Sequence, residues 1–343
     1  MGSTSLRVSE IGFGTGGTAG LMINGSFEEQ LQAVARAIEL GINYFDTAPD
    51  YGTGVSESNL GKVLAELGVR PVIATKVEVR QENLADIAGH IQRSVDASLQ
   101  RLGLDYVDIV QIHNGPFATR PDLQGRDYRV LGIEDYFASG GAIEGLERLL
   151  RAGKTRFIGF ICRGEDGAQV KELLDTNLFH MINLVYTLMN PTAAIPKPEG
   201  LSLDSDFGQV IAYATQKGVG TAVYSPLAGG LLADQIIGGG EFHPLSRGGR
   251  RPQSDQLQRQ VSRAAALSFL SIPDRHSLAQ AAIRFILMQP GVTTVLGGFS
   301  SLGQLEEVAA TSGSGPLAPE LMARVEMVWR TNFGARFSEH PSV

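Results

Sequence analysis

The stretch GFGTGG, residues 12–17, separates the two folds that suit a chain of alternating strands and helices. An open, doubly wound sheet places a GxGxxG turn directly between its first strand and its first helix. No glycine spacing in this stretch opens directly into a helix, because a helical pattern resumes only near Phe27. The stretch therefore favours a closed (β/α)8 barrel, and an open sheet with an appended domain is the alternative.

Short apolar runs alternate with helical patterns along the whole chain. The runs are almost uniformly apolar, which is typical of parallel strands that are buried on both faces. We expect the eight strands at residues 8–14, 44–46, 72–76, 107–113, 155–161, 181–185, 220–224 and 294–297. The expected helices lie at residues 27–40, 57–67, 83–102, 142–151, 165–176, 206–217, within 255–288, and at 301–310. An amphipathic segment at 320–330 predicts one extra C-terminal helix, so that residues 1–343 form a single barrel domain.

Two expected connections are much longer than the usual length of roughly four to six residues. They span residues 114–141, after the fourth strand, and residues 226–252, after the seventh. In a barrel both lie on the face where the strands end, which carries the active site. The second is rich in glycine and arginine, and it is either a mobile lid or an ordinary surface loop. The first is expected to line a substrate pocket with Phe117, Arg120, Arg126, Tyr128, Tyr136 and Phe137.

The composition is that of an ordinary globular protein, with 43% apolar and 19% charged residues. The 29 Lys and Arg residues against 36 Asp and Glu argue against nucleic acid or an anionic membrane surface as a partner. The chain has no apolar run near the roughly 18 residues of a membrane span, and it does not start with a signal-peptide pattern. We therefore expect a cytoplasmic protein, and the sequence is compatible with a homo-oligomer.

Ionisable residues stand at the ends of three consecutive expected strands: Asp46, Lys76 and His113. Side chains at the ends of neighbouring parallel strands converge on one opening of a barrel. The turn TAPDYG follows Asp46 and can bring Tyr51 over the same opening. We therefore predict a site made of Asp46, Tyr51, Lys76 and His113. The alternative is purely structural, with a salt bridge between strands, a loop anchor at Tyr51 and a partly buried histidine.

These four residue types suit a proton-donating site. A tyrosine with an ordinary pKa of about 10 ionises poorly at neutral pH, but a nearby ammonium group lowers that pKa. Lys76 can supply the ammonium, Asp46 can keep it charged, and His113 can donate a hydrogen bond to an oxygen atom. No nucleophile–base pair is evident, so a cofactor that carries hydride best completes the site. No metal is expected, and the histidines read as structural or surface residues are His90, His180, His243, His276 and His340.

Six segments carry a family pattern in one order over nearly the whole chain. They are GINYFDTAPDYG at 41–52, VIATKV at 72–77, YVDIVQIH at 106–113, AGKTRFIGF at 152–160, TAVYSPLAGGLL at 221–232 and VLGGFSSLGQLEEV at 295–308. The pattern resembles the aldo-keto reductases. This resemblance implies a (β/α)8 barrel that reduces carbonyls or oxidises alcohols with an extended nicotinamide cofactor. It also implies that Tyr51 is the general acid, that Asp46 and Lys76 tune it, and that His113 orients the carbonyl.

The resemblance also implies which residues hold the cofactor. Tyr224 matches a residue that stacks on the nicotinamide, and Asn183 matches one that binds its carboxamide. Ile161 and Cys162 stand where the family usually has Ser-Asn, so altered carboxamide binding is expected, with Cys162 a buried, inert thiol. Gln304 replaces a frequent cation; NADPH is expected on the family pattern and NADH is the alternative. The other expected cofactor contacts are Gly14, Thr15, Ser225, Leu227, Gly229, Gly298, Phe299, Ser300 and Glu307.

The function expected from this resemblance is hydride transfer between a nicotinamide cofactor and a small carbonyl or alcohol, such as an aldehyde, a ketone or a sugar. The alternative is a cofactor-binding regulatory or partner-binding barrel with slow chemistry. The Ile161–Cys162 departure favours that alternative, and the intact set of Asp46, Tyr51, Lys76 and His113 opposes it.

Overall fold

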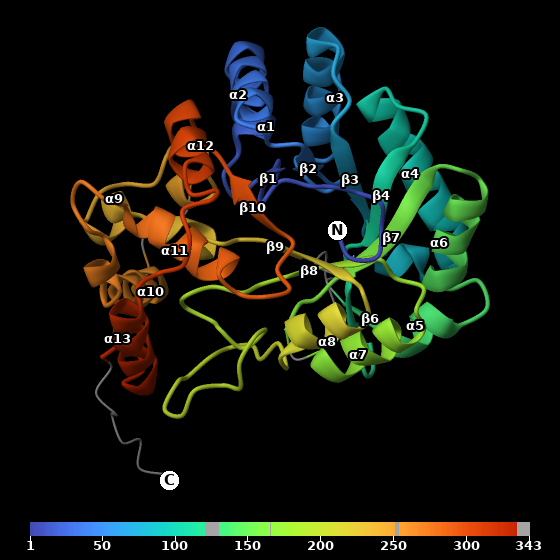
Figure 1. The fold of residues 1–343 in the computed structure, drawn as a ribbon. Coiled ribbons are helices and arrows are strands. Elements are labelled where there is room, and N and C mark those ends of the chain that lie inside the picture. Colours follow the sequence, from blue (N-terminus) through green and yellow to red (C-terminus); the bar gives the residue numbers. More distant parts are fainter. Residues whose placement is uncertain (121–129, 165, 251–253, 335–343) are drawn as a thin grey trace.

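A closed barrel of eight parallel strands forms the centre of the computed structural model, which describes residues 1–120, 130–164, 166–250 and 254–334 (Figure 1). Around the barrel the strands are β1 (Ile11–Gly14), β10 (Thr294–Gly298), β9 (Gly220–Val223), β8 (Met181–Leu184), β7 (Thr155–Ile161), β4 (Val107–Ile112), β3 (Val72–Val77) and β2 (Tyr44–Asp46). The strand β2 pairs with β1 and closes the ring. The predicted (β/α)8 barrel is therefore confirmed, and the open-sheet alternative is wrong.

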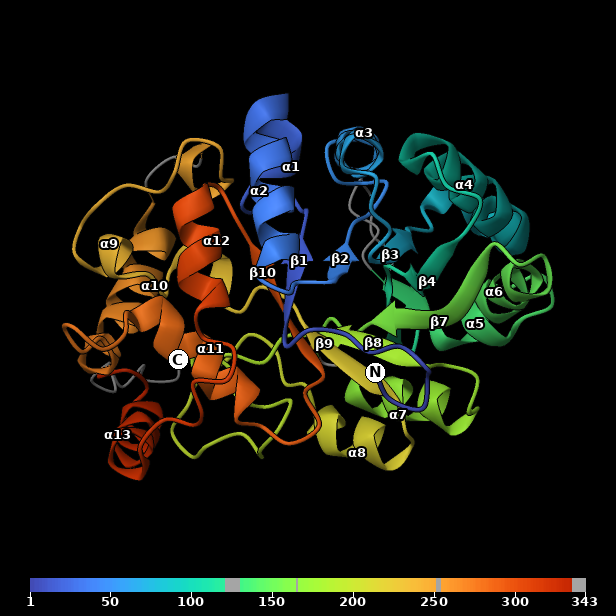
Figure 2. The ribbon, with the colours of Figure 1, turned by 45° about the horizontal axis from the view of Figure 1, so that its top comes forward.

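Helices surround the barrel in both views of the ribbon (Figures 1 and 2). Those that follow the strands are α2 (Phe27–Glu39), α3 (Val55–Leu67), α4 (Ile87–Leu102), α6 (Ala142–Arg151), α7 (Gly167–Asp175), α8 (Val210–Gln216), α11 (Leu278–Leu287) and α12 (Leu302–Ala309). Further helices are α1 (Leu21–Asn24), α5 (Ile133–Phe137), α9 (Asp234–Ile237), α10 (Asp255–Ala265) and α13 (Pro319–Arg330). The short helix α1 was not predicted, because its four residues give no periodic pattern.

Local signals explain several helix ends. The Ser26 hydroxyl accepts a hydrogen bond from the Glu29 backbone N–H at 3.2 Å, and the Glu29 carboxylate accepts one from the Ser26 N–H at 2.7 Å. This capping box satisfies two backbone donors that the first turn of α2 leaves free. The expected helix at 83–102 begins as a 3-10 turn, η1 (Gln81–Asp86), and the region 255–288 contains α10, η4 (Ser268–Leu270) and α11.

The long connections are partly ordered by small elements. The one after β4 contains a parallel pair, β5 (Gly115–Phe117) and β6 (Val130–Gly132), followed by α5, while residues 121–129 lie outside the described part of the chain. The one after β9 contains η2 (Ala228–Gly230), α9 and η3 (Gly248–Arg250). A third long connection, residues 185–209 between β8 and α8, was not predicted; Figure 1 shows it as an extended yellow-green loop.

Two layers of side chains fill the inside of the barrel. The lower layer is apolar and buried, and it consists of Tyr44, Ala74, Ile109, Met181, Ala222 and Leu296. Because side chains alternate along a strand, residues two positions later form the next layer towards the carboxyl ends of the strands. That layer consists of Asp46, Lys76, Gln111, Asn183, Tyr224 and Gly298. Gly12 belongs to the wall of the lower layer, where a Cβ atom would lie 2.9 Å from the Tyr44 ring. The polar side chains thus lie directly above the lower apolar layer, which is the apolar floor of the site.

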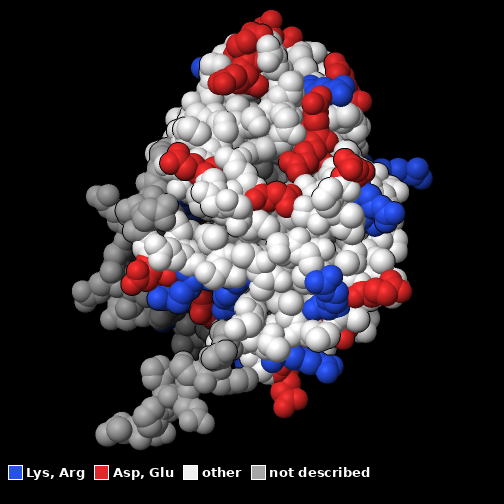
Figure 3. All heavy atoms as spheres, turned by 90° about the vertical axis from the view of Figure 1, so that its left-hand side faces the viewer, with Lys and Arg blue, Asp and Glu red and all other residues white. Residues whose placement is uncertain are grey.

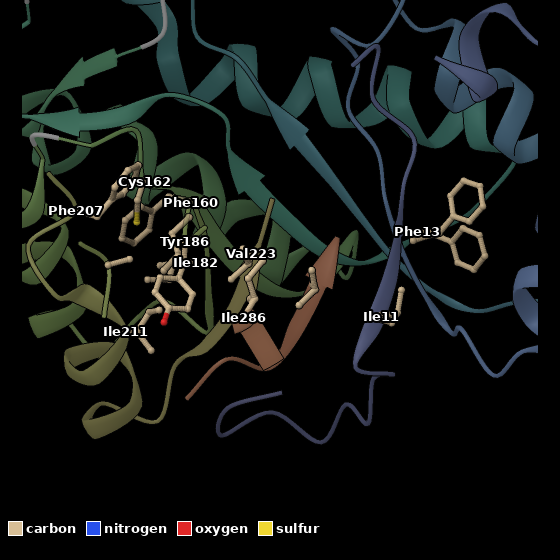
Figure 4. Close-up of a cluster of buried hydrophobic side chains, with 14 of the residues drawn as sticks. Ile11, Phe13, Phe160, Cys162, Ile182, Tyr186, Phe207, Ile211, Val223 and Ile286 are labelled. Carbon is tan, nitrogen blue, oxygen red and sulfur yellow. The ribbon is translucent and has the colours of Figure 1, made fainter. Parts of the chain in front are cut away.

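A second core lies between the strands and the helices. Figure 4 shows Cys162 beside Phe160 and Phe207 in this core. The final helix α13 packs through Trp329, whose indole N–H donates to the Leu188 carbonyl at 2.7 Å. The predicted extra helix is therefore present.

The outer surface has no single dominant charge on the face that Figure 3 shows, where Lys and Arg are scattered among Asp and Glu. Within the described residues, no helix combines the length and the apolar character that crossing a membrane requires.

Candidate active site

The four predicted catalytic residues meet at the carboxyl end of the barrel. The Lys76 ammonium contacts the Asp46 carboxylate and donates to the Thr47 carbonyl at 2.8 Å; the lysine is 1% and the aspartate 3% exposed. The Tyr51 ring centroid lies 5.0 Å from Lys76 Nζ and 5.8 Å from the His113 ring, which meets it edge-on. Asp46 and Lys76 also form the salt bridge that the structural alternative expected, because their ion pair joins the neighbouring strands β2 and β3.

Burial controls the protonation of this group. It raises the pKa of Tyr51 above its ordinary value, although the Lys76 charge acts in the opposite direction. The expected lowering of the tyrosine pKa is thus outweighed, because the desolvation of a phenolate costs more than one ammonium group restores. Burial would lower the pKa of Lys76, but Asp46 and Tyr51 raise it, so the lysine stays charged. Burial lowers the pKa of His113 to about 4, so its ring is neutral at pH 7.

Sequence reasoning missed an ionic cluster beside the histidine. The carboxylates of Asp50 and Glu78 lie 3.2 Å and 3.3 Å from the same guanidinium nitrogen, Nη2 of Arg80. Asp50 also contacts His113 Nδ1 at 3.1 Å. Burial, together with the Asp50 charge, raises the pKa of Glu78 to about 7. Strand alternation could have indicated Glu78, because it stands two residues after Lys76 and faces the same side.

Two cavities meet at the tyrosine. One, of about 720 Å³, is lined by charged and polar side chains that include Asp50, Glu78, Arg80, His113 and Arg163. The other, of about 400 Å³, runs as a groove past β1, β9 and β10 to helix α12. The residues common to both linings are Thr18, Asp46, Tyr51, Tyr224 and Ser225. A molecule in the groove and a molecule in the charged cavity would therefore meet beside Tyr51.

Most of the expected cofactor contacts line the groove. They are Gly14, Tyr224, Ser225, Leu227, Gly229, Gly298, Ser300, Gln304 and Glu307. Three expected contacts do not line it. Asn183 lines the charged cavity instead. Phe299 is 1% exposed and packs edge-on against Phe13, and Thr15 is buried with its hydroxyl donating to the Asp46 carbonyl. Strand alternation explains why Thr15 faces away from the groove, because Gly12 and Gly14 are the positions of this strand that face the inside of the barrel. His243, expected to be a structural or surface residue, also lines the groove.

The groove and the adjoining part of the charged cavity have features that fit a nicotinamide dinucleotide. Asn183 donates to the Asp46 carboxylate at 3.1 Å, and its buried Oδ1 atom has no partner among the described residues, so it can accept from a carboxamide. The Tyr224 hydroxyl donates to the Cys162 carbonyl at 3.1 Å, which fixes a ring that borders both cavities. After β9 the backbone takes left-handed conformations at Ser225 (φ 52°) and Ala228 (φ 50°). Such backbone turns present N–H groups towards anions such as a pyrophosphate.

Ile161 and Cys162, which stand where the family usually has Ser-Asn, lie in different surroundings. Ile161 lines the charged cavity, and Cys162 is fully buried with its pKa raised well above the ordinary value by that burial. The thiol therefore points away from the site and cannot replace the usual amide group. Within the part of the chain that the structure describes, no three His, Cys, Asp or Glu side chains gather as a metal site would require.

The expected substrate loop contributes less than predicted. Arg126 and Tyr128 lie outside the described residues. The described members Phe117, Arg120, Tyr136 and Phe137 line neither cavity. Tyr136 instead donates to the Asn114 carbonyl at 2.8 Å, and Arg120 pairs with Asp135 at 3.0 Å, so these polar groups stabilise the loop itself.

A family model gives the decisive comparison. The model of the Aldo/keto reductase family matches residues 10–330. The chain belongs to this family. This aldo-keto reductase is 31% identical over 313 residues to an L-galactose dehydrogenase of Arabidopsis thaliana, covering 90% of this chain and 86% of that protein. It is 26% identical to a putative voltage-gated potassium channel subunit beta of Schizosaccharomyces pombe, with 96% and 92% coverage.

A solved structure has the same fold. The glycerol dehydrogenase of Gluconobacter oxydans superposes with a TM-score of 0.71 over 99% of this chain and 97% of its own, at 21% identity. As a member of its family, this aldo-keto reductase is an oxidoreductase that uses a nicotinamide cofactor.

Proposed function

We propose that this chain interconverts an alcohol and a carbonyl on a small polyhydroxylated molecule, such as a sugar or a polyol, and that Tyr51 is the general acid and base. The observation that carries this proposal is the junction of the two cavities at Tyr51, with a groove lined by most of the expected cofactor contacts on one side and a charged cavity on the other. The carboxylates in that cavity can accept hydrogen bonds from the hydroxyl groups of a sugar, and its guanidinium groups can donate hydrogen bonds to them. The names of the L-galactose and glycerol dehydrogenases agree with this substrate class.

The residues divide the chemistry among them. A nicotinamide ring bound beside Tyr224 would supply or accept the hydride. Tyr51, protonated at neutral pH, donates its phenolic proton to the oxygen of a forming alcohol and takes the proton back in the oxidation direction. Lys76 stabilises the phenolate that this transfer leaves, and Asp46 keeps the lysine charged. Asn183 would hold the carboxamide through its free Oδ1 atom.

A substrate panel tests this function. Aldoses, polyols, aldehydes and ketones are assayed with NADH, NADPH and their oxidised forms, and the expected result is turnover of a hydroxylated compound. The alternative is a regulatory barrel, which Ile161 and Cys162 favour because they remove the family's usual carboxamide ligands. Tight cofactor binding without turnover of any compound would support that alternative and overturn the enzyme proposal.

The charge of the groove argues for NADH over the NADPH that the family pattern suggested. Among the residues that the structure describes, no lysine or arginine lines the groove, whereas Asp234, Glu241 and Glu307 do. A 2′-phosphate next to these carboxylates would meet repulsion. Arg247, a described cation near the groove, lines the two cavities beside it and not the groove itself.

We therefore expect the Kd of NADH to be at least about tenfold lower than that of NADPH, which corresponds to about 1.4 kcal/mol. Gln304→Arg should narrow this difference, because it places a cation on the loop after β10. Fluorescence titration of the two cofactors measures both effects, and Gln235→Arg, elsewhere on the groove wall, is the control. Tighter NADPH binding by the unmodified protein would contradict this expectation.

A further inference from the structure

We propose that Arg163 binds an anionic group of the substrate, a carboxylate or a phosphate, in the charged cavity. The proposal rests on the proposed function and narrows it. The substrate becomes a polyhydroxylated carbonyl compound or alcohol that also carries a negative charge, such as a sugar acid or a sugar phosphate. Carboxylate and phosphate are the groups that the fork of a guanidinium group binds with two parallel hydrogen bonds.

The half-buried side chain of Arg163 is held at the mouth of the barrel, next to the reacting groups. Its Nη2 atom donates to the His113 carbonyl at 2.6 Å. Its stem passes Gly115, where a Cβ atom would lie 2.5 Å from Cγ of the arginine. Burial raises the pKa of Tyr51 and of Tyr224, and the Arg163 charge acts against this effect at both. The guanidinium group therefore lies within electrostatic reach of the proposed acid.

The chain does not satisfy this guanidinium group. Among the described residues no carboxylate pairs with it, and its buried Nε atom has no hydrogen-bond partner. Asp166, three residues later, instead accepts from the backbone N–H groups of Arg163 and Gly164 at 2.8 Å and 3.0 Å. Burying a charged donor without a partner costs free energy. The unused donors of Arg163 therefore indicate a ligand that the described part of the chain does not supply.

The acidic side chains of the cavity lining are already paired. The pairs are Lys76 with Asp46, and Arg80 with Asp50 and Glu78. Besides Arg163, the remaining cation in the lining is Arg247, which is exposed and has no ion pair within the described ranges. Both unpaired charges are thus positive, so the cavity attracts an anion.

Arg163 lies on the substrate side of Tyr51. It lines the charged cavity and not the groove, whereas the backbone turn that suits a pyrophosphate lines the groove at Leu227 and Gly229. The arginine directly follows Ile161 and Cys162, the positions where the chain departs from the usual Ser-Asn of its family. A cofactor in the groove would therefore leave the Arg163 donors to the substrate.

Two matched pairs of substrates test the proposal. Glucuronate carries a carboxylate that glucose lacks, and glyceraldehyde 3-phosphate carries a phosphate that glyceraldehyde lacks. We expect the unmodified protein to favour the anionic member of at least one pair by about 10- to 100-fold in kcat/KM, as hydrogen bonds to charged groups usually do. A preference in one pair alone supports the proposal and identifies the anion. Turnover of these compounds without a preference in either pair would overturn it.

Variants of the arginine separate anion binding from a structural role. Arg163→Gln should lower kcat/KM about 10- to 100-fold for the preferred anionic substrate and less than about threefold for its neutral counterpart. Arg163→Lys keeps the charge without the fork and should show an intermediate loss. The control is Arg156→Gln, which removes an exposed arginine near the opposite end of β7 and should change neither value. An equal loss for both substrates in Arg163→Gln would show that Arg163 only anchors the loop at His113, and would overturn the proposal.

A binding measurement gives an answer without turnover. The protein is saturated with a reduced cofactor, so that the groove is occupied, and is titrated calorimetrically with gluconate, inorganic phosphate and the neutral glucitol. We expect gluconate or phosphate to bind at least about tenfold more tightly than glucitol, and Arg163→Gln, but not Arg156→Gln, to lose this difference. Such binding with an inactive substrate panel would refute the proposed function and leave the anion site standing. Anion binding that is absent, or unchanged in Arg163→Gln, would overturn the anion site.

Discussion

Replacing Tyr51 with phenylalanine should lower kcat by about 100- to 10,000-fold, which is the usual contribution of a positioned general acid. The phenol is the group at the junction of the two cavities that can give a proton to the reacting oxygen, while its ring packs beside Lys76 and His113. Phenylalanine keeps the ring, so cofactor binding should stay within about twofold of the original Kd. Steady-state kinetics with the best substrate and a cofactor titration measure the two effects separately.

The barrel provides a control for this substitution. Tyr44 lies one layer below on the same strand as Asp46, and its hydroxyl donates to the Met181 sulfur at 3.6 Å. Tyr44→Phe therefore removes a buried phenolic oxygen from the same barrel without touching the predicted proton path. Its kcat should stay near that of the unmodified protein. If Tyr51→Phe kept more than a tenth of the original kcat, Tyr51 would not be the acid.

Replacing Lys76 with methionine should destabilise the folded protein by about 3–5 kcal/mol, the usual effect of leaving one member of a buried ion pair alone. Lys76 and Asp46 are both nearly inaccessible to water, so the aspartate would lose its main counter-charge and keep, among the described side chains, the Asn183 amide as a donor. Equilibrium unfolding in urea measures the change in free energy of unfolding.

The double variant Asp46→Asn with Lys76→Met separates a charge effect from a packing effect. It removes both charges, and it should recover most of the stability that the single variant loses, although turnover should remain low. A single variant within about 0.5 kcal/mol of the unmodified protein would show that the carboxylate is solvated or neutralised in another way.

The alternation of apolar runs and helical patterns predicted the barrel because each strand is short and buried on both faces. The same rule located Asp46, Lys76 and His113, since the ends of parallel strands must meet. The cluster of Asp50, Glu78 and Arg80 could be predicted only in part, because all three residues lie beyond the strand ends. Strand alternation indicates Glu78, directly after β3, but the paths of the loops that carry Asp50 and Arg80 depend on tertiary contacts.

The errors had different physical causes. Phe299 follows a groove residue in sequence, but its side chain turns into the core beside Phe13. Arg120 and Tyr136 lie on the correct long connection, yet they satisfy hydrogen bonds within it and leave the cavity wall to other segments. The choice between the two nicotinamide cofactors stays a prediction: the family pattern favours NADPH, and the charges that line the groove favour NADH.

The two-layer interior of the barrel indicates which positions of the site tolerate substitution without loss of core packing. Asp46, Lys76 and Asn183 stand on strands, directly above a closely packed apolar floor, so a change at any of them disturbs the core as well as the chemistry. Asp50 and Arg163 stand in turns beyond the strand ends, where a substitution alters the cavity wall and leaves the floor intact. On the proposed function, substitutions in these turns should change which substrates bind while the proposed proton-transfer site stays intact.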